Sequence, residues 1–192
     1  MRHTEQSLPV EVVVAPASAL EVDALVVPVF EGEADPSLAQ INEACSGRLN
    51  AEMASREFTA KPNTVLVAPI AASGWRPARV IAVGMGPRSN ADLSMVRQAA
   101  TTGALTARDG RCPRLAMLPP GVAALPDEGQ AIAEGLTLGA YYSGIYKKDP
   151  DAKPHATASV IAAPGGLSRD EREAFEQAVG RGYILGACSN FA

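Results

Sequence analysis

The sequence lacks the features that mark membrane and secreted proteins. Its 192 residues contain no run of about 18 apolar residues, the length that a membrane-spanning helix requires. The amino terminus, MRHTEQSLPV, has no apolar core of the kind found in secretion signals. We therefore expect a cytoplasmic protein that does not contact a membrane.

Cysteine and positive charge are also scarce. The three cysteines, Cys45, Cys112 and Cys188, are odd in number and form no CxxC pair, which favours reduced thiols over a disulfide framework. The 17 Lys and Arg residues are outnumbered by 21 Asp and Glu, so the formal net charge is −4. This acidic balance disfavours nucleic acid as a partner.

Residues suited to catalysis or metal binding are few. The two histidines, His3 and His155, lie in polar segments, and no HExxH motif is present. Carboxylates fall mostly on polar faces of predicted helices, as in SRDERE. The sequence therefore predicts no catalytic residue and no metal ligand in this chain.

What the sequence does contain is an alternation of short apolar runs and longer helical patterns. The runs are rich in Val, Ile, Leu and Ala without strict alternation, which indicates a sheet covered on both faces. The predicted strands are EVVVAP (11–16), ALVVPVF (24–30), TVLVAPI (64–70), ARVIAVG (78–84), RLAML (114–118) and ASVIAAP (158–164).

Four helices with start signals lie between these runs. Asp35-Pro36 precedes SLAQINEACSGRLNAEM, and the pairs Ser89/Asp92, Asp127/Gln130 and Ser168/Glu171 resemble capping boxes before the other three helices. The element order is then ββαββαβαβα, with crossovers long enough for parallel pairing. We predict an α/β protein: one domain over residues 1–192, with three α/β/α layers around a mixed, mostly parallel sheet of about six strands.

The third of these helices contains an unusual number of glycines. The segment AEGLTLGAYYSGIYKK (133–148) reads as helix, although each internal glycine costs about 1 kcal/mol relative to alanine. Gly135 and Gly139 are one turn apart, as are Gly182 and Gly186 in the last helix. Such spacing lets a backbone approach its neighbour closely. We expect a tightly docked helix whose buried stripe comprises Ala131, Gly135, Leu138, Tyr142 and Ile145.

Glycine-containing turns follow three of the predicted strands. They are GMGPRSN, PPGVAA and APGGLSRD, and backbone N–H groups in such turns can bind phosphate. The anion-turn candidates are Gly84, Gly86, Gly165 and Gly166. A dinucleotide fingerprint would need glycine where Ser89 stands, and Pro87 removes one donor.

Four segments together resemble a known family. DALVVPVFEGE (23–33), RVIAVGMG (79–86), EGLTLGAYYSGIYK (134–147) and GYILGACSNFA (182–192) are similar, in order and spacing, to segments of the N-terminal domain of leucyl aminopeptidases, the M17 metallopeptidases or cytosol aminopeptidases. The resemblance covers almost the whole chain.

The resemblance implies a macro-domain-like fold and a structural role. It implies that a C-terminal catalytic domain is absent from this chain, that it would hold two divalent cations (Zn or Mn), and that the parent removes N-terminal amino acids from peptides. The partners implied are that catalytic domain and further copies in a hexamer, and the fragment alone is expected to be inactive. A different class of function stays open: a stand-alone macro-type module that binds ADP-ribose or a related nucleotide.

Overall fold

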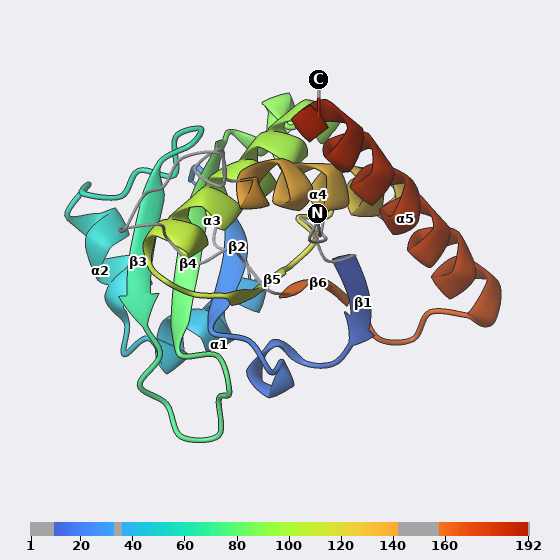
Figure 1. The fold of residues 1–192 in the computed structure, drawn as a ribbon. Helices are drawn as coiled ribbons and strands as arrows, with labels where there is room; N and C mark the ends of the chain where they lie inside the picture. Colours follow the sequence, from blue (N-terminus) through green and yellow to red (C-terminus); the bar gives the residue numbers. More distant parts are fainter. Residues whose placement is uncertain (1–9, 33–35, 142–157, 192) are drawn as a thin grey trace, which may run out of the picture.

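The structure, a computed structural model, describes residues 10–32, 36–141 and 158–191. These residues form one six-stranded sheet in the order β1-β6-β5-β2-β4-β3 (Figure 1). Strand β3 is antiparallel to β4, and the other neighbours are parallel. The strands are β1 (Val10–Val14), β2 (Ala24–Phe30), β3 (Val65–Pro69), β4 (Arg79–Gly86), β5 (Arg114–Met117) and β6 (Ala158–Ala163).

The helices lie in two layers, one on each face of the sheet (Figure 1). The helices are α1 (Pro36–Ala44), α2 (Arg48–Ala54), α3 (Leu93–Asp109), α4 (Leu125–Ala140) and α5 (Arg169–Phe191), with short 3-10 helices η1 (Ala17–Ala19) and η2 (Arg88–Asn90). Helices α3, α4 and α5 cover one face, and α1 and α2 cover the other. The predicted three-layer architecture and mostly parallel sheet are confirmed.

Strand β2 shows why the sheet is covered on both sides. All seven of its residues are buried, and successive side chains point to opposite faces because a strand has a period of two. Val26 and Phe30 join the core beneath α3, α4 and α5, whereas Leu25 and Val29 join the core beneath α1 and α2. The continuous apolar run in the sequence therefore serves two cores at once.

Helix α4 is held between α3 and α5 by the predicted glycines. A Cβ on Gly135 would lie 2.3 Å from the carbonyl oxygen of Arg97 in α3, and one on Gly139 would lie 2.6 Å from that of Thr101. On the other side, a Cβ on Gly182 of α5 would lie 2.1 Å from the carbonyl oxygen of Gln130. No side chain fits at these positions, so the predicted close backbone approach is confirmed.

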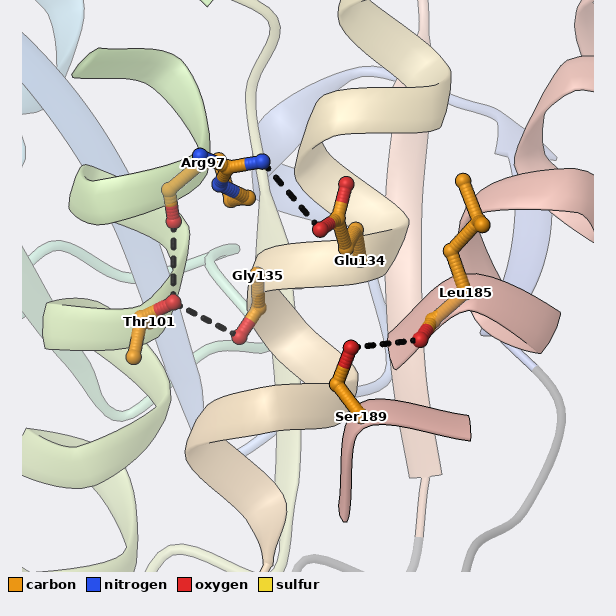
Figure 2. Close-up of polar contacts among 6 residues, drawn as sticks. All are labelled: Arg97, Thr101, Glu134, Gly135, Leu185 and Ser189. Atoms are coloured by element: carbon orange, nitrogen blue, oxygen red, sulfur yellow. Dashed lines mark hydrogen bonds and ion pairs between the residues drawn. The ribbon is translucent and has the colours of Figure 1, made fainter. Parts of the chain in front are cut away.

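Polar contacts cross the α3–α4 seam alongside these glycines. The Thr101 hydroxyl donates toward the carbonyl oxygens of Arg97, 3.0 Å away, and Gly135, 3.1 Å away (Figure 2). The Arg97 guanidinium also pairs with the Glu134 carboxylate at 3.2 Å. Small residues thus permit the approach, and the hydroxyl satisfies carbonyl groups that the contact would otherwise desolvate.

The expectation for α4 is wrong at its C-terminal end. The helix ends at Ala140, because Tyr141 adopts an extended conformation (φ −63°, ψ 131°). Leu138 is only half-buried, and the fully buried leucine is Leu136. The remainder of the predicted segment, residues 142–148 with Tyr142 and Ile145, lies outside the described residues.

Other helix boundaries also differ from the expectation. The first predicted helix is two helices, because Ser46 and Gly47 have φ values of +56° and +78°, a conformation that breaks a right-handed helix. Helix α3 is capped by Asp92, whose carboxylate accepts from the Met95 amide at 2.8 Å, rather than by Ser89.

The three remaining start signals have different outcomes. Helix α4 begins at Leu125, so Asp127 lies inside its first turn and is not its cap. The Ser168–Glu171 box is confirmed, with the Ser168 amide donating to the Glu171 carboxylate at 2.8 Å and the Glu171 amide donating to the Ser168 hydroxyl at 3.3 Å. At α1, Pro36 is the first helical residue, and Asp35 lies outside the described residues.

Candidate functional site

The carboxyl ends of the parallel strands carry the three predicted glycine turns. Gly84 and Gly86 of the first motif lie within β4 itself and are not open to a ligand. A Cβ on Gly84 would lie 2.2 Å from the carbonyl oxygen of Lys61, and the amides of Gly84 and Gly86 donate to Thr64 and Ala60 at 2.8 Å each. These two glycines are packed against the segment before β3, and their amides are already engaged.

The turn after β6 is open. Nothing lies within 4 Å of a Cβ built on Gly165 or Gly166, and both residues are exposed. Gly165 lines a cleft of about 770 Å³ at the ends of β1, β5 and β6. Of the four candidate glycines, Gly165 is therefore the one that the structure places at this cleft.

The cleft walls are mostly apolar. Among the described residues that line it, Glu128 is the only one that can carry a charge. The lining residues are Val14, Ala15, Pro16, Leu118, Pro119, Gly121, Ala123, Leu125, Glu128, Ala162, Ala163, Pro164 and Gly165. The position is the one at which open α/β sheets bind ligands, but the walls offer no cation to a phosphate.

The turn between β5 and α4 (residues 119–124, the β5–α4 turn) converges on one carboxylate. The Gly121 amide donates to Oε2 of Glu128 at 3.2 Å, and the Ala123 amide donates to Oε1 at 3.1 Å. The Val122 amide donates to the same Oε1. Glu128 is 1% exposed, so these amides take the place of water around its carboxylate.

Arg88 holds the opposite side of the same turn. Its guanidinium lies 3.3 Å from the carbonyl oxygen of Pro120 and 3.4 Å from that of Gly121. It also lies 3.9 Å from the centroid of the Phe30 ring, a cation–π contact. The turn is therefore fixed between a cation on its carbonyl side and an anion on its amide side.

Sequence reasoning missed both Glu128 and Arg88 as residues of this region. A partial signal existed for Glu128, because it is an acidic residue in the first helical turn after a glycine turn. This signal was overlooked because the sequence analysis assigned the helix cap to Asp127. Arg88 had no sequence signal, because its contacts join segments that are 32 and 33 residues apart.

The cysteines and acidic residues do not form a reactive centre in the part of the chain that the structure describes. Cys45 and Cys112 are buried, and burial raises the pKa of each thiol, which lowers its reactivity. Cys188 is exposed on α5. Among the described residues, no three His, Cys, Asp or Glu side chains lie close enough to hold a metal ion. His3 and His155 lie outside these residues.

The layers, the sheet order and the cleft at the strand ends define a macro-domain-like α/β/α domain. Residues 26–150 match the cytosol aminopeptidase family, N-terminal domain, and the chain belongs to this family. No helix among the described residues is both long enough and apolar enough to cross a bilayer.

Individual relatives agree with this assignment. The chain is 34% identical over 190 residues to a probable cytosol aminopeptidase of Streptomyces griseus, an alignment that covers 89% of this chain and 36% of the relative. The chain thus spans about a third of the length of the curated relatives that it matches.

Solved structures support the fold alone. A tomato leucine aminopeptidase mutant aligns with a TM-score of 0.66 at 17% identity, covering 90% of this chain and 35% of that chain. A macrodomain of Trypanosoma brucei in complex with ADP aligns with a TM-score of 0.60 at 13% identity, covering 90% of this chain and 69% of that chain. At these identities the likeness carries no ligand to this chain.

Proposed function

We propose that residues 1–192 form the non-catalytic N-terminal domain of a cytosolic, metal-dependent leucyl aminopeptidase. The parent protein would release N-terminal amino acids from peptides. The observation that carries this proposal is the family match over residues 26–150, together with a relative named probable cytosol aminopeptidase of which the chain covers 36%.

The chemistry would reside in a C-terminal catalytic domain. We place there the two divalent cations, Zn or Mn, that the resemblance to this family implies. The described residues contribute a cleft with one internally bound carboxylate, and two-metal hydrolysis needs several carboxylates that converge on both ions.

The exposed side of α5 is the surface that we assign to the catalytic domain. Ile184 is 59% exposed and Leu185 is 46% exposed, next to each other near the end of the last helix. The family relatives are almost three times as long as this chain, so a large domain is available to cover them. Packing between the two domains, and subunit contacts in a hexamer, would then be the role of this domain.

The docking surface has its own test. Changing Ile184 and Leu185 to Lys should change the melting temperature of the chain little, because both side chains are exposed and Lys is favourable near the C-terminus of a helix. The same double change should abolish association with the catalytic domain supplied as a second chain. Undiminished association would show that the catalytic domain contacts another face of this domain.

Inactivity of the chain alone is the direct test of its proposed role. We expect no turnover of a leucine anilide above buffer when Mn²⁺ or Zn²⁺ is added. Metal-dependent hydrolysis that co-purifies with the folded chain through two chromatographic steps would overturn the proposal.

The alternative, a macro-type module that binds ADP-ribose, has one specific basis, the fold shared with an ADP-bound macrodomain. Against it stand the engaged amides of Gly84 and Gly86 and the amides of the β5–α4 turn that Glu128 already binds. Calorimetric titration with ADP-ribose should give no dissociation constant tighter than about 1 mM. A micromolar constant that is lost on changing Gly165 to a bulky residue would favour the alternative.

A further inference from the structure

The β5–α4 turn has the geometry of an anion-binding turn. Its three successive amides, from Gly121, Val122 and Ala123, point at the same carboxylate. Converging backbone amides of this kind bind phosphate and other oxyanions in many proteins. Gly121 has φ +70° with open space on its Cβ side, and this positive φ turns its amide toward the two that follow.

The turn also lies where a ligand would be expected. It follows a parallel strand, lines the cleft shared by β1, β5 and β6, and immediately precedes the start of α4, the positive end of that helix. Arg88 binds the carbonyl oxygens of Pro120 and Gly121 and so orients the peptide groups with their amides away from it. The donors are therefore preorganised for an anion.

We propose that Glu128 is an internal ligand that occupies this anion-binding turn and closes it to oxyanions from solution. The carboxylate reaches back from the first turn of α4 and takes up all three amides, so an external phosphate would have to displace a tethered anion. Tethering gives the internal group an effective concentration far above that of a free anion. Removal of the carboxylate converts the closed turn into an oxyanion site.

Thermal melts of Glu128→Ala, with inorganic phosphate as the probe, test this inference. The variant should melt at a lower temperature than the parent, and phosphate should raise its melting temperature in a saturable manner. Chloride at equal ionic strength should not. The parent should show only the small rise, without saturation, that phosphate gives folded proteins generally through exclusion from their surface.

A matched control uses another acidic residue of the same helix. Glu134→Ala also removes a partly buried carboxylate of α4, but that carboxylate pairs with Arg97 and not with the turn amides. We expect no saturable phosphate-specific rise in its melting temperature. An equal rise in Glu134→Ala and Glu128→Ala, or no rise in Glu128→Ala, would overturn the proposal.

A nearly isosteric variant keeps the proposal testable if Glu128→Ala does not fold. In Glu128→Gln, the carboxamide can still accept from Val122 and Ala123, but its NH₂ group faces the Gly121 amide, donor against donor. Hydrogen exchange at Gly121 should then accelerate by about tenfold or more. Unchanged exchange at Gly121 would mean that the carboxylate does not hold the turn.

These outcomes are separate from the aminopeptidase assignment. A failure of phosphate to bind Glu128→Ala leaves the family and the inactivity of the chain as they stand. Conversely, peptide hydrolysis by the chain would overturn the proposed function but would not bear on the role of Glu128 in the β5–α4 turn.

Discussion

Glycines in two regions of this molecule have opposite surroundings. In the helical layer, the space beside Gly135 and Gly182 is filled by the backbone of a neighbouring helix. At the carboxyl ends of the strands, nothing lies near the Cβ positions of Gly121 and Gly166, and both have positive φ. The first pair is glycine because of packing, and the second pair because of backbone conformation. A side chain therefore has different consequences in the two regions.

The largest effect is expected in the helical layer. Gly135→Leu places a side chain where the carbonyl oxygen of Arg97 would be 2.3 Å from Cβ, so α3 and α4 must separate. We expect a loss of about 1–3 kcal/mol in the free energy of unfolding, and the single methyl of Gly182→Ala should have the same sign. Urea denaturation measures both. Unchanged midpoints would mean that the helices are not in contact there.

A smaller loss is expected in the open turn after β6. Gly166→Ala meets no neighbouring atom, but φ of +84° is unfavourable for a residue with a Cβ. The expected cost is about 1 kcal/mol, from backbone strain alone. Because the cause is conformational, Gly166→Asn should cost less than Gly166→Ala in the same urea experiment. Equal costs would point to a steric cause instead.

A gain is expected within the helical layer itself, two residues before Gly182. Gly180 is exposed on α5, has helical conformation and has nothing within 4 Å of the position that an added methyl would take. Gly180→Ala should therefore stabilise the chain by about 0.5–1 kcal/mol through helix propensity. It is also the control for Gly182→Ala. If both Gly180→Ala and Gly182→Ala lowered the free energy of unfolding, the open space beside Gly180 would not explain the effect of an added methyl group.

The smallest effect concerns the start of α5, and it depends on pH. Hydrogen bonds from the Ser168 hydroxyl and then from the Ser168 amide lower the pKa of Glu171 in the folded chain. A lowered folded pKa contributes stability that is present above the unfolded pKa and is lost as pH falls through the folded value. Glu171→Gln should therefore melt slightly below the parent at neutral pH and together with it in acid. A difference that persists in acid would contradict this.

The sequence predicted the strands well, because their signal is local. The apolar run of β2 predicted Ala24–Phe30 with no boundary error. The helix ends were less predictable. The Ser46-Gly47 pair, which separates α1 from α2, lay inside a continuous helical pattern. Its positive φ values close the end of α1 locally, because the Gly47 amide donates back to the carbonyl oxygen of Asn42 at 2.8 Å, and this glycine stop was overlooked.

The site was predicted only in outline. The glycine turns at the strand ends could be located, but the amides of Gly84 and Gly86 are engaged by the segment before β3, which sequence spacing does not place beside them. Glu128 binds amides only five to seven residues before it, a local contact that the assignment of the cap to Asp127 obscured. Arg88 acts across a tertiary contact that depends on how β4 and β5 are placed in the sheet. Local patterns therefore indicated where a ligand could approach, but not which donors remain available.

The pairing of β1 with β6 bears on the order in which the chain folds. Val10 and Ser159 are neighbours in the sheet although most of the chain separates them, so their contact closes a very long loop. Contacts of this kind form late, because closing the loop costs conformational entropy before the paired strands contribute any favourable free energy. The strands β2, β4 and β5 pair over shorter distances along the chain and can assemble first. As an edge strand that is paired on one side, β1 is then the strand that we expect to join the sheet last and to exchange its amide protons first.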